Sequence, residues 1–83
     1  MKEKIIVEFE WVKAKKCIDL EIPLDITANE LLYGLNQGLH LGIHMEDLEQ
    51  CYLSTENPIV LLQGDTLLSE YGLHNGTKIF FTR

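Results

Sequence analysis

The chain has 83 residues, of which 46% are hydrophobic and 24% are charged, which is the composition of an ordinary globular protein. A chain of this length buries only about 60–65% of its unfolded surface, so we expect one domain with one core over residues 1–83. Seven basic against thirteen acidic residues give a net charge of -6, which disfavours nucleic acid as a partner because phosphates repel an acidic surface.

Two segments near the N-terminus, residues 5–9 and 17–22, place an apolar residue at every second position. A period of two is typical of a strand with one face on a core. Residues 12–16 between them are short and basic enough to form a hairpin loop. The sequence therefore predicts an antiparallel hairpin.

A helix is predicted over residues 28–38. Thr27 and Glu30 have the spacing of a capping box, in which the hydroxyl accepts from the Glu30 N–H while the carboxylate reaches back to the cap. Leucines then recur every four residues from Leu31 to Leu39, and this stripe is expected to face the sheet.

The segment 39–45 has two possible structures. Its apolar residues alternate with His40, Gly42 and His44, a pattern that by itself indicates a strand. The alternative is an extended connector tucked under the sheet, followed by a short turn of helix over residues 45–50.

The C-terminal third predicts short strands at residues 51–54 and 59–62 and a last strand at 78–82. The segment 67–73 is too short for a stable helix of its own, and Asn75-Gly76 is a turn sequence. This order predicts an α+β β-grasp fold, a mixed sheet of four to five strands packed on one helix. A ferredoxin-like fold is the alternative, but it would need a second full helix.

Three short segments carry a resemblance to a known family: residues 22–27 entering the helix, residues 42–47 after it, and the Leu-Ser-Glu-Tyr-Gly-Leu sequence at 68–73. On these the chain resembles the ubiquitin-like superfamily, and within it the bacterial YukD/EsaB group. The resemblance implies that Leu68 and Leu73 anchor a turn in the core, and that the Tyr71 hydroxyl bonds to nearby main chain.

The same resemblance implies a cytoplasmic accessory protein of the Gram-positive type VII (WXG100, ESAT-6-like) secretion machinery. Ubiquitin-like modifiers and sulfur carriers react through a flexible Gly-Gly tail, whereas this chain ends Phe-Phe-Thr-Arg. We therefore expect an adaptor that is not conjugated. The alternatives are a diverged modifier or sulfur carrier, or a β-grasp domain excised from a larger scaffold.

No set of residues in the sequence predicts catalysis, so we expect no enzyme activity and no cofactor. Cys17 and Cys51 lack the neighbours that activate a nucleophile, and we interpret them as reduced thiols of a cytoplasmic protein. His40 and His44 have no third ligand at a useful spacing, so no metal is expected. No apolar run approaches the roughly 20 residues of a membrane span, and insertion into a membrane is not expected.

A protein partner is the remaining expectation, and alternation along the strands suggests where it binds. The residues expected to face the helix are Ile5, Val7, Ile18, Leu20, Ile79 and Phe81. Ile6, Tyr52, Phe80 and Cys17 would then face outward, with Ile6 beside Phe80 on adjacent parallel strands at the centre of a binding patch. Trp11 either extends this patch or caps the edge of the core, and the oligomeric state stays open.

Overall fold

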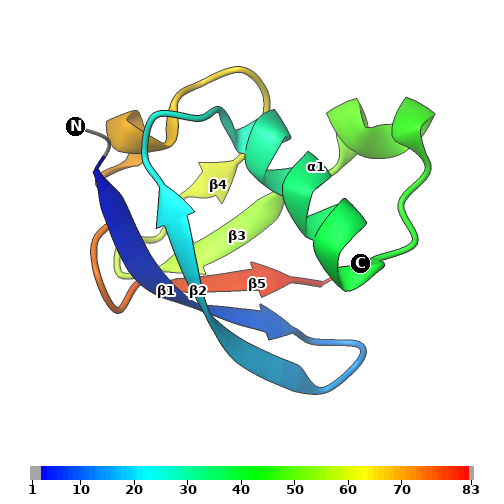
Figure 1. The fold of residues 1–83 in the computed structure, drawn as a ribbon, viewed down its shortest axis with the longest axis horizontal. Coiled ribbons are helices and arrows are strands. Elements are labelled where there is room, and N and C mark those ends of the chain that lie inside the picture. The colour runs from blue at the N-terminus through cyan, green and yellow to red at the C-terminus, as the bar shows by residue number, and fades with distance from the viewer. Residues whose placement is uncertain (1–2, 83) are drawn as a thin grey trace.

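The computed structural model describes residues 3–82. Eight elements follow one another along the chain (Figure 1): β1 (Lys4–Trp11), β2 (Lys16–Pro23), α1 (Ala28–Leu39), the 3₁₀ helix η1 (Met45–Gln50), β3 (Leu53–Glu56), β4 (Leu61–Leu62), the 3₁₀ helix η2 (Leu68–Tyr71) and β5 (Lys78–Phe81).

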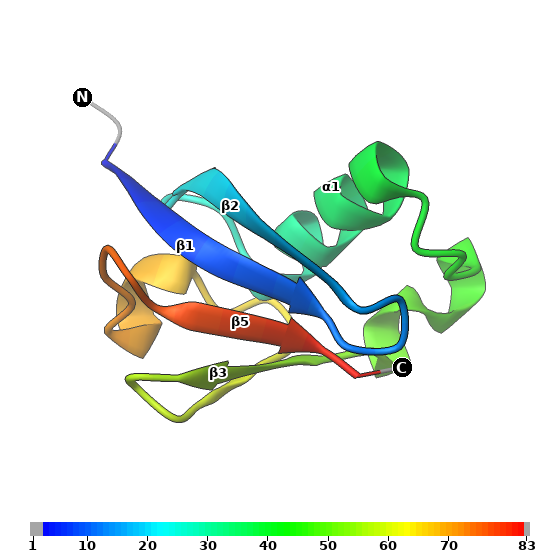
Figure 2. The ribbon, with the colours of Figure 1, turned by 90° about the horizontal axis from the view of Figure 1, so that it is seen from below.

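The five strands form one mixed sheet in the order β2-β1-β5-β3-β4. The first and last strands, β1 and β5, are adjacent and parallel, whereas the other neighbours are antiparallel. Figure 2 shows β5 between β1 and β3, and Figure 1 shows α1 against one face of the sheet. This is the β-grasp fold that the order of elements predicts.

The core lies between α1 and the inner face of the sheet. Alternation places Val7, Phe9, Ile79 and Phe81 there, each only 1% exposed. The helix contributes its leucine stripe from the other side, and the buried helical residues are Ala28, Leu31, Leu32 and Leu35.

Two inward-facing residues of β2 are incompletely covered. Ile18 is 38% exposed and Leu20 is only partly buried. Alternation assigns them to the correct face, but β2 is the end strand of the sheet. A side chain on an end strand has a neighbouring strand on one side only, which leaves Ile18 and Leu20 less buried than the inward-facing residues of β1 and β5.

The capping box forms as predicted. Thr27 Oγ1 accepts from the Glu30 N–H at 3.1 Å, and Glu30 Oε1 accepts from the Thr27 N–H at 3.2 Å. The helix ends at Leu39, one residue later than predicted, with His40 in the left-handed conformation as its C-cap.

The segment after the helix is a connector and not a strand. Leu41 is buried, and the Asn36 side chain holds Ile43 by two hydrogen bonds, from its Nδ2 to the Ile43 carbonyl at 2.9 Å and from the Ile43 N–H to its Oδ1 at 3.0 Å. The short helix predicted over 45–50 follows as η1. A side chain on α1 thus satisfies main-chain groups that a strand would have paired.

The turn at η2 covers one end of the core. Leu68 is completely buried and Leu73 is 7% exposed, as the resemblance implies. The Leu68 N–H donates to the Ile26 carbonyl at 2.8 Å, and the Tyr71 hydroxyl donates to the Gln63 carbonyl at 3.2 Å. Tyr71 itself is only partly buried and packs at the margin of the core.

Candidate functional site

The outer face of the sheet, opposite α1, carries Phe80 at its middle. Phe80 lies between Glu10 of β1 and Ser54 of β3 in the strand register. Its side chain is partly exposed, whereas its neighbours Ile79 and Phe81 are buried on the other face. The alternation predicted for this strand therefore has the correct parity.

Ile6 does not lie beside Phe80, and that part of the expected patch is wrong. The parallel register pairs Glu8 with Lys78 and Glu10 with Phe80, which places Ile6 four residues further back along β1. There its main chain contacts the turn before β5: the Gly76 N–H donates to the Ile6 carbonyl at 2.9 Å, and Asn75 Oδ1 accepts from the Ile6 N–H at 2.8 Å. The Ile6 side chain is 53% exposed at that end of the outer face.

Tyr52 and Leu61 lie nearer to Phe80. Ser54 pairs with both Phe80 and Leu61, so the side chains of Ser54, Phe80 and Leu61 share the outer face. Tyr52 precedes Ser54 by two residues and is 47% exposed, while Leu61 is 50% exposed. We call Tyr52, Leu61 and Phe80 the outer patch. Leu61 was missed by the sequence because a two-residue strand has too little pattern to reveal its parity.

Trp11 belongs to the inner face and does not extend the outer patch. It follows Val7 and Phe9 in parity, packs against the core, and its ring centroid lies 6.3 Å from that of Phe81 with the planes tilted by 53°. Of the two roles that the sequence left open, the structure has Trp11 at the edge of the core.

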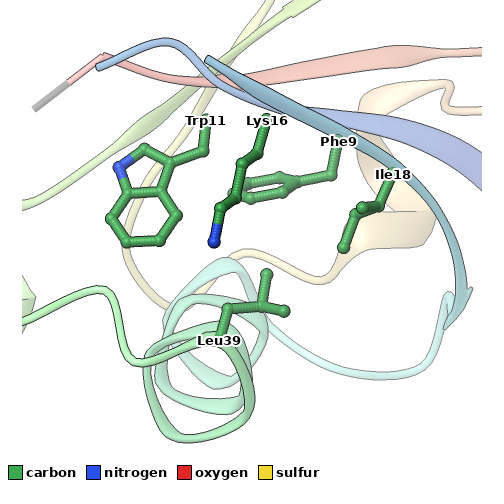
Figure 3. Close-up of a pocket in the computed structure, with 5 residues that line it drawn as sticks. All are labelled: Phe9, Trp11, Lys16, Ile18 and Leu39. Atoms are coloured by element: carbon green, nitrogen blue, oxygen red, sulfur yellow. The ribbon is translucent and has the colours of Figure 1, made fainter. Parts of the chain in front are cut away.

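A groove opens beside Trp11. It has a volume of about 210 Å³ and is lined by Phe9, Trp11, Lys16, Ile18 and Leu39. Figure 3 shows the strand residues pointing down toward Leu39 of α1. Pockets for small molecules usually have roughly 300–1,000 Å³, so this groove has the size for one or two aliphatic side chains.

The β1–β2 half of the outer face is acidic. Glu8 pairs with Asp19, Glu10 pairs with Cys17, and Ile6 pairs with Glu21 across the two strands. Lys4 forms a salt bridge with Glu21 at 3.6 Å. Carboxylates thus surround the one exposed thiol of the described chain, Cys17.

Cys17 is not an activated nucleophile. Its Sγ donates to Glu8 Oε1 at 2.9 Å. This hydrogen bond, together with desolvation and the negative charges of Glu8, Glu10 and Asp19, raises the pKa of Cys17 to about 11. A catalytic thiol needs the opposite environment, one that stabilises the thiolate.

Among the side chains that the structure describes, no three of His, Cys, Asp or Glu are grouped so that they could hold a metal ion. In the described part of the chain, no helix has the length and apolar character that a membrane crossing needs. What the described surface offers is an apolar patch, an acidic face and a groove.

Comparison with known proteins assigns the family. The sequence profile of the WXG100 protein secretion system (Wss) protein YukD matches residues 5–80. The chain belongs to the YukD family. No curated protein has significant sequence similarity to it.

Solved structures similar in fold to this YukD family member include the following two. One is the C-terminal ubiquitin-like domain of mouse tubulin-specific chaperone e, with 15% identity, a TM-score of 0.75, and coverage of 95% of this chain and 84% of the other. The second is a de novo designed protein based on ubiquitin, with 18% identity, a TM-score of 0.65, and coverage of 93% and 84%. At such identities the likeness establishes the ubiquitin-like fold alone.

Proposed function

We propose that this YukD family member is a non-conjugating, non-enzymatic ubiquitin-like adaptor, which acts in the cytoplasm as one domain over residues 1–83. Its partner is a protein component of the WXG100 secretion machinery. The family carries the link to secretion, and the observation that carries the adaptor role is the outer patch.

The outer patch has the chemistry of a protein interface. Phe80 and Tyr52 are aromatic, and aromatic side chains are enriched at the centres of interfaces. Phe80 lies in β5 and Tyr52 directly precedes β3, so the sheet restricts their positions and little conformational entropy is lost when a partner binds. The acidic residues beside them are suited to guide a partner that carries a basic rim.

The other two residues expected at the binding site have different places in this proposal. Ile6 lies at the far end of the same face and would contact only the periphery of a partner. Trp11 faces the groove on the inner side of the sheet and lies outside the outer patch.

The experiment compares two tyrosines of similar exposure on opposite faces. Tyr52 is 47% exposed on the outer face and Tyr33 is 44% exposed on α1. Tagged chains carrying Tyr52→Ala, Phe80→Ala or Tyr33→Ala are recovered from the native cell, and the co-purifying secretion components are quantified by mass spectrometry.

We expect the Tyr52→Ala and Phe80→Ala chains to recover at least about tenfold less partner than the parent chain, since an interface anchor contributes roughly 2 kcal/mol or more. Tyr33→Ala should retain it. Equal recovery by all three variants would exclude the outer patch, and a partner that stays attached in denaturant would contradict non-covalent binding. Phe81→Ala, which removes a buried ring, should instead lower stability by about 3–5 kcal/mol.

A further inference from the structure

The outer edge of β2 has main-chain groups available to another strand. In the hairpin, the Leu24 N–H donates to the Glu3 carbonyl at 2.9 Å, which makes these opposite residues a hydrogen-bonded pair. Such pairs alternate with non-bonded ones in antiparallel strands. The register then directs the N–H and C=O groups of Cys17, Asp19 and Glu21 away from β1.

Within residues 3–82 no strand occupies that edge, because β2 ends the sheet. The groove lies directly beneath it, between the strand and the end of α1 (Figure 3). Ile18 stands between Cys17 and Asp19 in the chain and points inward to line the groove. The main-chain edge and the apolar groove therefore form one continuous surface.

We propose that this edge and groove are a second docking site, which takes an extended segment of a protein partner as an added antiparallel strand. Antiparallel pairing is the more stable per residue, and addition of a strand to a sheet edge is an established mode of peptide binding. A residue opposite Ile18 would point inward into the groove, next to Trp11 and Leu39.

The chemistry of this segment follows from the two faces of β2. The side chain opposite Ile18 faces the groove, and the side chain opposite Leu20 faces the same side of the sheet, where Leu20 packs against the core, so both must be apolar. Those opposite Cys17, Asp19 and Glu21 face the acidic side of the sheet. Carboxylates favour lysine or arginine there, since opposite charges on adjacent strands stabilise the pair. The partner segment is thus one in which basic and apolar residues alternate.

The same charges argue against a second copy of this chain. Pairing β2 with β2 of another molecule would bring Asp19 and Glu21 of both copies onto one face, beside Glu8 and Glu10. Like charges opposite one another on a sheet are destabilising, and the chain carries a net charge of -6. Asp19 and Glu21 instead attract a basic segment.

Trp11 is the only tryptophan of the chain and lines the groove, so its fluorescence reports directly on occupancy. The probe is a capped synthetic peptide of the length of β2 in which lysine alternates with isoleucine. A control peptide has the same residues with the lysines and isoleucines in separate blocks, so that charge and composition are matched.

We expect the alternating peptide to shift Trp11 emission to shorter wavelength and to move the amide resonances of Cys17, Asp19 and Glu21. The block peptide should do neither. Ile18→Ala should weaken binding about tenfold, since it removes roughly 1.4 kcal/mol of apolar contact. Tyr52→Ala, on the outer patch, should leave binding unchanged, and this keeps the second site distinguishable from the first.

Two substitutions of Asp19 separate its main-chain hydrogen bond from its charge. Asp19→Pro removes an N–H that points away from the hairpin, a position where an edge strand tolerates proline, and it should abolish binding. Asp19→Asn keeps the N–H and should lose only the charge contribution.

A pair of modified peptides leaves the protein untouched. In the antiparallel register the main-chain N–H and C=O groups of the peptide's lysines form the hydrogen bonds to β2, whereas those of its isoleucines point away. N-methylation of the lysine amides should therefore abolish binding, while N-methylation of the isoleucine amides should not. Equal binding of both methylated peptides, or of the block peptide, would overturn the proposal. So would dimerisation of the chain through β2 in sedimentation, because the edge would then be occupied by a second copy.

Discussion

The reactivity of Cys17 tests the electrostatics of the outer face at the scale of one residue. Its pKa of about 11 leaves a smaller fraction of thiolate at pH 8 than an ordinary thiol has. We expect slow alkylation by iodoacetamide, with a rate that keeps rising up to about pH 11. Because the raised pKa belongs to the folded chain, its contribution to stability is present below the pKa of the unfolded thiol and is lost as the pH rises through about 11.

Glu8→Val removes both the hydrogen-bond acceptor and its charge, and should speed alkylation of Cys17 the most. Glu10→Val removes only a charge and should have a smaller effect. Intact mass spectrometry measures both rates. If the Glu8 variant reacts at the rate of the parent chain, the bond between Cys17 and Glu8 does not persist in solution.

Tyr71 connects η2 to the loop before it through its hydroxyl and its ring. Because the ring is only partly buried, Tyr71→Ala should lower the free energy of unfolding by about 1.5–3 kcal/mol. Tyr71→Phe keeps the ring and should cost only about 0.5–1 kcal/mol. Chemical denaturation measures both, with Tyr33→Phe as the exposed control. Two neutral substitutions would mean that Leu68 and Leu73 alone anchor the turn.

Asn36 decides the structure of an entire segment at the scale of elements. It bonds to both main-chain groups of Ile43, and we expect these two bonds to hold 41–44 as a connector. Asn36→Ala leaves these partly buried groups without their partner and should cost about 1–3 kcal/mol. Gln37→Ala, at the exposed next position of α1, is the matched control.

Hydrogen exchange separates a local effect from a global one in this variant. The amide of Ile43 should exchange faster in Asn36→Ala, while amides of the central strands change only with global stability. An unchanged Ile43 amide together with an unchanged denaturation midpoint would show that the connector is held by the burial of Leu41 instead.

The charge of the whole molecule opposes its fold. Glu8 faces Asp19 on the acidic face, and a net charge of -6 adds repulsion over the rest of the surface. Raising NaCl from about 0.05 M to about 0.5 M screens these charges, and we expect the free energy of unfolding to rise by about 0.2–1 kcal/mol. Asp19→Asn should reduce this rise in the free energy of unfolding with salt. A fall in stability with salt would mean that attractive pairs such as Lys4 with Glu21 dominate.

Local patterns in the sequence determined most of the fold. The alternation in β1 and β5, the capping box at Thr27 and the turn anchored by Leu68 each depend on residues within one or two turns of chain. Each formed at or near its predicted place, whereas the resemblance to the YukD group rested on the short segments 22–27, 42–47 and 68–73.

The tertiary structure alone decided how the surface is assembled. The register between β1 and β5 joins segments about seventy residues apart, and no local pattern encodes it, so Ile6 was placed beside Phe80 when Glu10 lies there. The end position of β2 left Ile18 uncovered, and pairing with Ser54 turned Leu61 outward. Alternation determines which face of the sheet a side chain lies on. Its neighbours on that face depend on pairing between distant segments of the chain, and a binding surface consists of such neighbouring side chains.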